Sequence, residues 1–204
     1  MQNIIFDLGG VLIEWDPNVV YRNYFANDNE KIQRFYDETG IWSINSETDR
    51  GTPYVEVLNK LIEKFPNHKE PITLWHSQWR DMVRGDIPGS KAILNSLHQQ
   101  KYPLYALTNW AKETFFPFVP QTFNFISYFK DIVISGVEKT CKPELRIYQI
   151  LLERNNLTAK DCIFIDDRAE NLMPAKQLGM DVIQFSSPEQ LHDELKNRKI
   201  ITQI

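Results

Sequence analysis

Short apolar runs rich in Ile, Val, Phe and Tyr recur along the chain, separated by longer amphipathic stretches. The runs occupy Asn3 to Phe6, Tyr102 to Leu107, Asp131 to Ile134, Cys162 to Ile165 and Asp181 to Phe185. Runs of this kind are typical of parallel strands buried on both faces. Segments such as KAILNSLHQQ, ELRIYQILLERN and ENLMPAKQLG between them have helical spacing. The alternation predicts an α/β domain with a doubly wound, Rossmann-like parallel sheet.

Residues 15–86 break this alternation. We find no strong strand signal there, and segments such as NVVYRNYF, YVEVLNKLIEKF and ITLWHSQWRDMV have helical spacing throughout. The stretch starts just after the first strand and ends near Pro88 and Gly89, which interrupt regular structure. We therefore predict an α/β core of residues 1–14 and 87–204, with residues 15–86 inserted as a small all-helical cap domain.

Composition and charge narrow the class of protein. The chain has 204 residues, 42% of them apolar, which is ordinary for a globular protein, and a net charge of -4 with no basic stripe for nucleic-acid phosphates. No apolar segment approaches the roughly 20 residues of a membrane span. Cys141 and Cys162 lie far apart, and the N-terminus does not resemble a secretory signal. We expect a cytoplasmic monomer or homodimer that binds neither nucleic acid nor membranes.

Polar side chains stand where the predicted strands end. Ligands of open parallel sheets bind beyond the carboxyl ends of the strands, so residues at these ends are candidates for a site. They are Asp7 after the first strand, Thr108 and Asn109 in ALTNW, Lys142 in the turn KTCKPE, and Asp166 with Asp167 in IFIDDRAEN. We expect a hydroxyl, an amide, an ammonium and three carboxylates at one edge of the sheet.

This set of groups indicates a phosphate site with a metal ion. Three neighbouring carboxylates do not all stay ionised without a cation, and oxygen ligands without His or Cys favour Mg²⁺. Mg²⁺, Lys142 and the Thr108 hydroxyl can surround the oxygens of a phosphoryl group. Asp7 is then free to attack phosphorus and form an aspartyl-phosphate, which water hydrolyses.

The candidate residues lie in four short segments, in the order FDLGGVL, LTNW, CKPELRIY and FIDDRAEN. They resemble the four motifs of the haloacid dehalogenase-like (HAD) hydrolase superfamily, and most of all its phosphatases with a small helical cap after the first strand. The resemblance spans nearly the whole chain, including SETDRGTP and MVRGDIPG in the cap. Some capped sugar-phosphate phosphatases of this family are also similar in having DLG in the first motif.

The resemblance implies a role for each matching residue. Asp7 is expected as nucleophile and metal ligand, and Thr108 and Lys142 as holders of the transferring phosphoryl group. Asn109 is expected to support the phosphate pocket. Asp166 and Asp167 are expected to serve Mg²⁺, with Asp167 favoured as the direct ligand.

The chain departs from the family pattern at Gly9, where phosphatases commonly have an aspartate that acts as general acid and base. The metal ligand expected from this position is the backbone carbonyl, which glycine retains. Proton transfer has no assigned group, and the substrate, a water or a cap residue such as Asp49 are the alternatives. The glycine also argues against a phosphomutase, which must move protons in both directions.

The cap is expected to set specificity, and its signals are weaker. Trp42 lies near a polar cluster of Glu47, Asp49 and Arg50, which either faces the active site or is a solvated loop. Trp42, Asp49 and Arg50 are therefore candidate specificity residues. Asn171 is interpreted as a helix-start or packing residue, with support of the acidic pair as the alternative.

The sequence thus predicts a Mg²⁺-dependent phosphatase of small phosphorylated metabolites, with a hexose phosphate as the favoured substrate. One alternative is a 2-haloacid dehalogenase, which uses an aspartate nucleophile on carbon without a metal. The other is a non-catalytic regulatory module that binds Mg²⁺ and phosphate, which Gly9 motivates.

Overall fold

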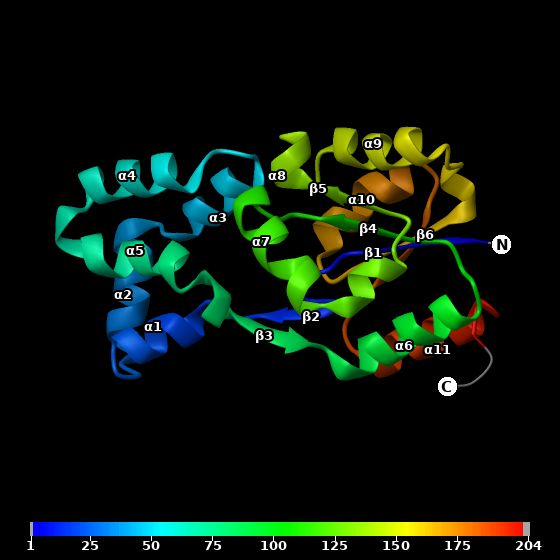
Figure 1. The fold of residues 1–204 in the computed structure, drawn as a ribbon, viewed down its shortest axis with the longest axis horizontal. Helices are drawn as coiled ribbons and strands as arrows, with labels where there is room; N and C mark the ends of the chain where they lie inside the picture. The colour runs from blue at the N-terminus through cyan, green and yellow to red at the C-terminus, as the bar shows by residue number, and fades with distance from the viewer. Residues whose placement is uncertain (1, 202–204) are drawn as a thin grey trace.

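The computed structural model describes residues 2–201. Its centre is a five-stranded parallel sheet in the order β5-β4-β1-β6-β7 (Figure 1). The strands are β1 (Asn3–Phe6), β4 (Leu104–Thr108), β5 (Asp131–Ile134), β6 (Cys162–Asp166) and β7 (Asp181–Gln184). Each coincides with an apolar run of the sequence to within two residues at either end, and the predicted α/β fold class is confirmed.

Helices cover both faces of the sheet. On one face lie α6 (Pro88–Gln99) and α11 (Pro188–Asn197), and on the other α9 (Leu145–Asn155) and α10 (Ala169–Gln177) (Figure 1). Successive residues of β1 point to opposite faces, so Ile4 belongs to one apolar core and Ile5 to the other. Both are fully buried. Burial on both sides explains why the strands are continuous apolar runs.

The segment between the first strand and α6 forms a separate group of helices, drawn at the left of Figure 1. Its interior is aromatic: the ring centroids of Tyr21 and Phe35 are 5.2 Å apart, and Trp75 is fully buried. The helices are α1 (Asn18–Tyr24), α2 (Asn29–Thr39), α3 (Trp42–Asp49), α4 (Tyr54–Lys64) and α5 (Lys69–Ser77), with short 3₁₀ turns at Pro66–His68 and Trp79–Met82. We call this group the cap.

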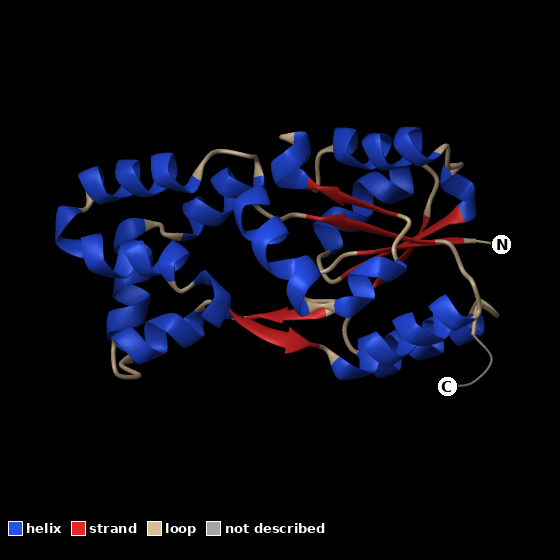
Figure 2. Ribbon diagram, viewed as in Figure 1, coloured by secondary structure: helices blue, strands red, loops and turns tan. Residues whose placement is uncertain are grey.

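The two connections between cap and core pair with each other. They form an antiparallel ribbon of β2 (Ile13–Trp15) and β3 (Val83–Asp86), visible as two opposed arrows in Figure 2. Ile13 lies opposite Asp86. The sequence did not indicate β3, because its residues VRGD include one large apolar side chain and a glycine. Pairing with β2 stabilises a strand that its own pattern does not predict.

Across residues 2–201, every helix is too short or too polar to cross a lipid bilayer. Cys141 and Cys162 are buried and unpaired.

Candidate active site

The polar residues predicted at the strand ends do meet at one edge of the sheet. Asp7 directly follows β1, Thr108 ends β4, and Asp166 ends β6. Because β1 lies between β4 and β6 with parallel register, these ends are neighbours. The Asp7 backbone N–H donates to Ile165 O at 2.8 Å, which continues the pairing one residue past the strand. The register therefore fixes where the Asp7 carboxylate stands.

Lys142 joins two of these carboxylates. Its Nζ lies 2.8 Å from Asp7 Oδ2 and 2.7 Å from Asp166 Oδ2, and the Lys142 side chain is 1% exposed. Burial disfavours the ammonium, but the two carboxylates outweigh it and raise the pKa of Lys142. The two carboxylates therefore favour the charged form of the lysine.

One ammonium does not balance three carboxylates. Oxygen atoms of Asp7, Asp166 and Asp167 lie within 4.8 Å of one another. The pKa of Asp7 is raised to about 7, mainly by burial. The charges of Asp166 and Asp167 also raise this pKa, and Lys142 opposes the increase. This donor set consists only of carboxylate oxygens, and its unbalanced negative charge suits a hard divalent cation such as Mg²⁺.

The two adjacent aspartates have different surroundings. Asp166 is fully buried, and its Oδ1 accepts from the Arg168 N–H at 2.9 Å and from Asn171 Nδ2 at 2.9 Å. Its Oδ2 accepts from Lys142 Nζ. Asp167 is partly exposed and lines the cavity described below. Of the two readings for Asn171, the contacts favour support of the acidic pair.

Asn109 acts on Lys142 through the main chain. Its Oδ1 accepts from the Lys142 N–H at 2.8 Å, and its Nδ2 donates to Lys142 O at 2.9 Å. The amide thus holds the loop from which the lysine side chain extends.

The two glycines after Asp7 are not equivalent. A Cβ on Gly9 would have no neighbour within 4 Å. Gly10 has φ +77, and a Cβ there would lie 2.8 Å from Asp167 Oδ2. Only Gly10 is therefore required as glycine by both backbone angle and space.

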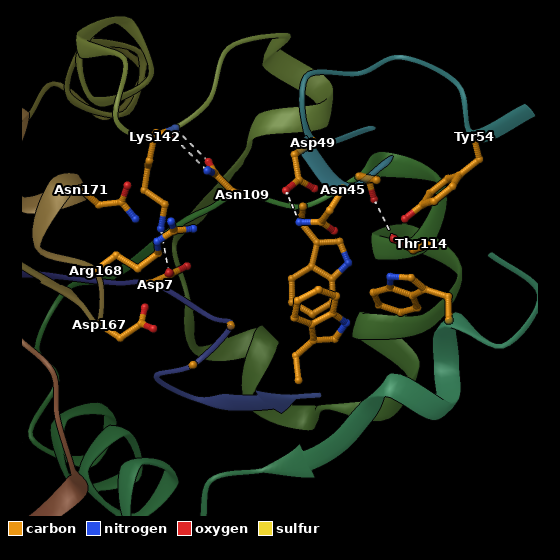
Figure 3. Close-up of a pocket in the computed structure, with 16 residues that line it drawn as sticks. Asp7, Asn45, Asp49, Tyr54, Asn109, Thr114, Lys142, Asp167, Arg168 and Asn171 are labelled. Carbon is orange, nitrogen blue, oxygen red and sulfur yellow. Dashed lines mark hydrogen bonds and ion pairs between the residues drawn. The ribbon is translucent and has the colours of Figure 1, made fainter. Parts of the chain in front are cut away.

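A cavity of about 290 Å³ lies between the cap and this edge of the sheet. Asp7, Lys142, Asp167, Arg168 and Asn171 gather at one end of it, Tyr54 and Thr114 lie at the other, and Asn45 and Asp49 stand between them (Figure 3). Trp15, Trp79 and Trp110 complete the lining. Thr108 is buried and does not line the cavity.

The cap candidates from the sequence separate into two groups. Asp49 is 7% exposed and lines the cavity, whereas Trp42 and Arg50 do not line it. Trp42 packs edge-on against Trp75 at 5.4 Å between ring centroids, and is 43% exposed. Arg50 forms an ion pair with Glu144 on the surface.

Several lining residues were not among the sequence candidates. Asn45 precedes Asp49 by one helical turn, and its Nδ2 donates to Asp49 Oδ2 at 3.0 Å. Trp110 directly follows Asn109, and Tyr54 begins α4. In the sequence, only the helical spacing of Asn45 from Asp49 could have indicated one of these residues. Using that spacing required knowing that α3 faces the core.

The chain is similar to known proteins over most of its length. A family model for haloacid dehalogenase-like hydrolases matches residues 1–179. The chain is 26% identical over 206 residues to mouse acyl-CoA dehydrogenase family member 10, spanning 95% of this chain but only 18% of the mouse protein. It is 28% identical to a sesquiterpene phosphatase of Aspergillus oryzae, covering 86% of this chain and 85% of that one.

The chain is also similar to a bacterial phosphatase and to a solved bacterial structure. The chain is 21% identical to a D-ribitol-5-phosphate phosphatase of Bacteroides thetaiotaomicron, over 96% of this chain and 97% of the relative. Its structure is similar to that of a HAD family enzyme of the same organism solved with magnesium and inorganic phosphate. The TM-score is 0.67 at 23% identity, with 92% of this chain and 95% of the other covered. At this identity the likeness establishes the shared fold.

Proposed function

Because the chain belongs to the haloacid dehalogenase-like hydrolases, we propose that it is a Mg²⁺-dependent phosphatase of small phosphorylated metabolites. One observation carries the proposal: Asp7, Asp166 and Asp167 bring carboxylate oxygens within 4.8 Å of one another. The Lys142 ammonium contacts two of them, Asp7 and Asp166, at the end of a cavity. A phosphorylated substrate is negatively charged, so it binds where positive charge from Lys142 and a metal ion is available. The same positive charge reduces the repulsion between the Asp7 carboxylate and the phosphoryl group that it attacks.

Asp7 and Asp167 are the proposed carboxylate ligands of Mg²⁺, together with the backbone carbonyl of Gly9. The lone pairs of Asp166 are engaged by Lys142, Asn171 and the Arg168 N–H, which suits an indirect role. When bound, Mg²⁺ supplies positive charge that offsets the carboxylates and attracts phosphoryl oxygens. The Bacteroides enzyme of the same fold was solved with magnesium and inorganic phosphate, which supports the choice of Mg²⁺ as the metal.

In the proposed reaction a carboxylate oxygen of Asp7 attacks phosphorus and the ester oxygen departs. Lys142 lines the cavity and holds the transferring phosphoryl group. Thr108 is buried at the end of β4, the strand next to β1, so its proposed contact with the phosphoryl group comes from beneath the cavity lining. Asn109 fixes the loop of Lys142. Water then attacks the aspartyl-phosphate, releasing inorganic phosphate and restoring Asp7. The Lys142 ammonium, 2.8 Å from Asp7 Oδ2, stabilises the carboxylate that leaves in this second step.

We propose sugar phosphates, a hexose phosphate first among them, as the substrates. The cavity of about 290 Å³ is at the small end of the range for ligand sites, which suits a small metabolite. Its amide, carboxyl and hydroxyl groups, from Asn45, Asp49 and Thr114, can bond to substrate hydroxyls. A sesquiterpenyl chain would leave these groups without partners. The relative named for D-ribitol 5-phosphate supports this preference.

We also propose that the protein is cytoplasmic and is a monomer or homodimer. Two buried, unpaired cysteines are compatible with a reducing compartment. Light scattering coupled to size exclusion measures the oligomeric state.

The proposal is tested by a phosphate-release screen over hexose, pentose and alditol phosphates, nucleotides, phosphoglycolate and farnesyl phosphate. Each substrate is assayed with Mg²⁺ and with EDTA, and Asp7→Asn is the control. We expect Mg²⁺-dependent release that Asp7→Asn abolishes. Full activity in EDTA contradicts the metal role, and metal-independent halide release from 2-haloacids would instead support a dehalogenase. Mg²⁺ binding without turnover of any substrate supports the non-catalytic module.

A further inference from the structure

Hydrolysis of a sugar phosphate expels an alkoxide, which needs a proton as the P–O bond breaks. Gly9 supplies no acid beside the nucleophile. The ionisable side chains that line the cavity are Asp7, Asp49, Tyr54, Lys142, Asp167 and Arg168. Asp7 and Asp167 have roles in attack and metal binding. Burial raises the pKa of Tyr54, and carboxylates raise that of Lys142, while an arginine stays protonated. Asp49 is the remaining acid.

The geometry points to Asp49 of the cap as the general acid that protonates the leaving oxygen, in place of the acid absent at Gly9. This inference rests on the proposed phosphatase function. According to this inference, the cap both encloses the substrate and supplies a side chain that takes part in the reaction.

Asp49 is placed for this role by its helix. It is the last residue of α3, is 7% exposed, and lines the same cavity as Asp7 and Lys142. Figure 3 shows it between the phosphate-binding end, where Asp7 lies, and the far end at Tyr54. A leaving group bonded to phosphorus near Asp7 extends along this path. Asn45 donates to Asp49 Oδ2 at 3.0 Å and orients the carboxyl in the cavity.

The turn that carries Asp49 is attached to the core. The next residue, Arg50, forms an ion pair with Glu144, two residues after Lys142. Gly51 follows with φ +88, and a Cβ on it would lie 2.9 Å from the carbonyl oxygen of Gly136 in the core. These contacts hold the end of α3 against the loop of Lys142.

The surroundings of Asp49 allow its carboxyl both to donate and to accept a proton near neutral pH. Burial raises the pKa of the Asp49 carboxyl to about 7, while Lys142 and a hydrogen bond from the Ala111 backbone lower it. An acid whose pKa is near the working pH is available both to give and to take a proton.

As Asp7 bonds to phosphorus, the ester P–O bond breaks and its electron pair goes to the leaving oxygen. The proton of Asp49 transfers to that oxygen, so the products are a sugar hydroxyl, the aspartyl-phosphate and the Asp49 carboxylate. In the second step the Asp49 carboxylate takes a proton from the attacking water, and the bond from phosphorus to Asp7 breaks.

The test measures phosphoryl transfer to the enzyme in single turnovers with Mg²⁺. The two substrates are the sugar phosphate that the wild type cleaves fastest in the screen and p-nitrophenyl phosphate, whose leaving group scarcely needs a proton. Asp49→Asn and Asp49→Ala remove the acid with different changes of size. Glu47→Gln, on the same helix and outside the cavity lining, is the matched control.

We expect both Asp49 variants to lose ~10²- to 10⁴-fold on the sugar phosphate and much less on p-nitrophenyl phosphate. Glu47→Gln should match the wild type on both. Gly9→Asp, which has room for its Cβ, should restore sugar-phosphate transfer in the Asp49→Asn background, a rescue that a structural role would not allow. An unchanged ratio of the two rates in both Asp49 variants overturns the assignment of Asp49. A wild type that cleaves neither substrate overturns the proposed function instead.

Discussion

Asn109 holds the main chain of Lys142 at two atoms, accepting from its N–H at 2.8 Å and donating to its carbonyl oxygen at 2.9 Å. The pairing sets the direction in which the lysine leaves its loop. The Lys142 ammonium can thereby contact Asp7 and Asp166 at once.

Asn109→Asp tests this relationship, because it keeps the side-chain size but turns the donor into an acceptor that faces the Lys142 carbonyl oxygen. We expect a loss of about 1–3 kcal/mol in the free energy of unfolding. We also expect a lower kcat, since the lysine is no longer held. Thermal melts and kcat against the exposed control Asn59→Asp measure both effects. Unchanged stability and turnover would show that the loop holds its own shape.

The glycine pair gives a second prediction. Gly10→Ala places a Cβ 2.8 Å from Asp167 Oδ2 at φ +77, whereas Gly9→Ala meets no atom within 4 Å. We expect Gly10→Ala to displace Asp167 and weaken Mg²⁺ binding ~10- to 100-fold, the size of effect seen when a metal ligand loses its orientation. Gly9→Ala should bind Mg²⁺ as the wild type does. Calorimetric titration with Mg²⁺ measures both affinities, and equal affinities would argue against Asp167 as a ligand.

A third prediction concerns the attachment of the cap. Gly51 and Gly40 both have positive φ, +88 and +59, so alanine at either costs about 1–2 kcal/mol of stability. Only Gly51→Ala also collides with the core, at the carbonyl oxygen of Gly136. We expect both variants to lose Tm, Gly51→Ala more because of this collision, and only Gly51→Ala to lose kcat/KM on sugar phosphates. If kcat/KM is the same for both, the turn at Gly51 does not position Asp49.

A fourth prediction follows from the burial of Asp49. Its pKa of about 7 in the folded protein exceeds the value of 3.8 for an unperturbed aspartate, so the folded state binds the extra proton between these values. Stability contributed by that proton is present at low pH and is lost as pH rises toward 7. Asp49→Asn does not titrate. Its stability relative to the wild type should therefore increase between pH 5 and pH 7.5, by on the order of 2 kcal/mol.

Denaturant unfolding of the two proteins across this pH range measures the difference. The ionisable groups that face Asp49, namely Lys142, Tyr54 and Cys141, are the same in both proteins, so their own titrations largely cancel. A stability difference that does not change with pH would mean that Asp49 ionises normally in the folded state.

The fold was largely predictable because its strands are buried on both sides. Ile4 and Ile5 lie in different apolar cores, so the first strand shows as an unbroken apolar run. β3 was not predictable, since Val83–Asp86 is only partly buried and is stabilised by pairing with β2. The pattern of apolar residues in a segment indicates whether that segment is buried. It does not indicate with which strand a polar segment will pair.

The site was predictable where residues follow strands and less so where the cap contributes. The order of strands β4, β1 and β6 brings Asp7 and Asp166 together from positions far apart in sequence. In the cap, Trp42, Asp49 and Arg50 gave similar signals, yet only Asp49 lines the cavity. Which of these side chains faces the cavity depends on the direction in which each leaves α3 and on how α3 packs on the core. A short polar cluster in the sequence shows neither.

The claim that Asp7 is the nucleophile is tested most directly by trapping the covalent intermediate. Enzyme is mixed with Mg²⁺ and a sugar phosphate that it cleaves, quenched in acid within milliseconds, digested, and analysed by mass spectrometry. We expect phosphate on the peptide that contains Asp7 in the wild type, and neither label nor phosphate release in Asp7→Asn. Phosphate release that persists in Asp7→Asn, or a label on a different residue, would contradict the account.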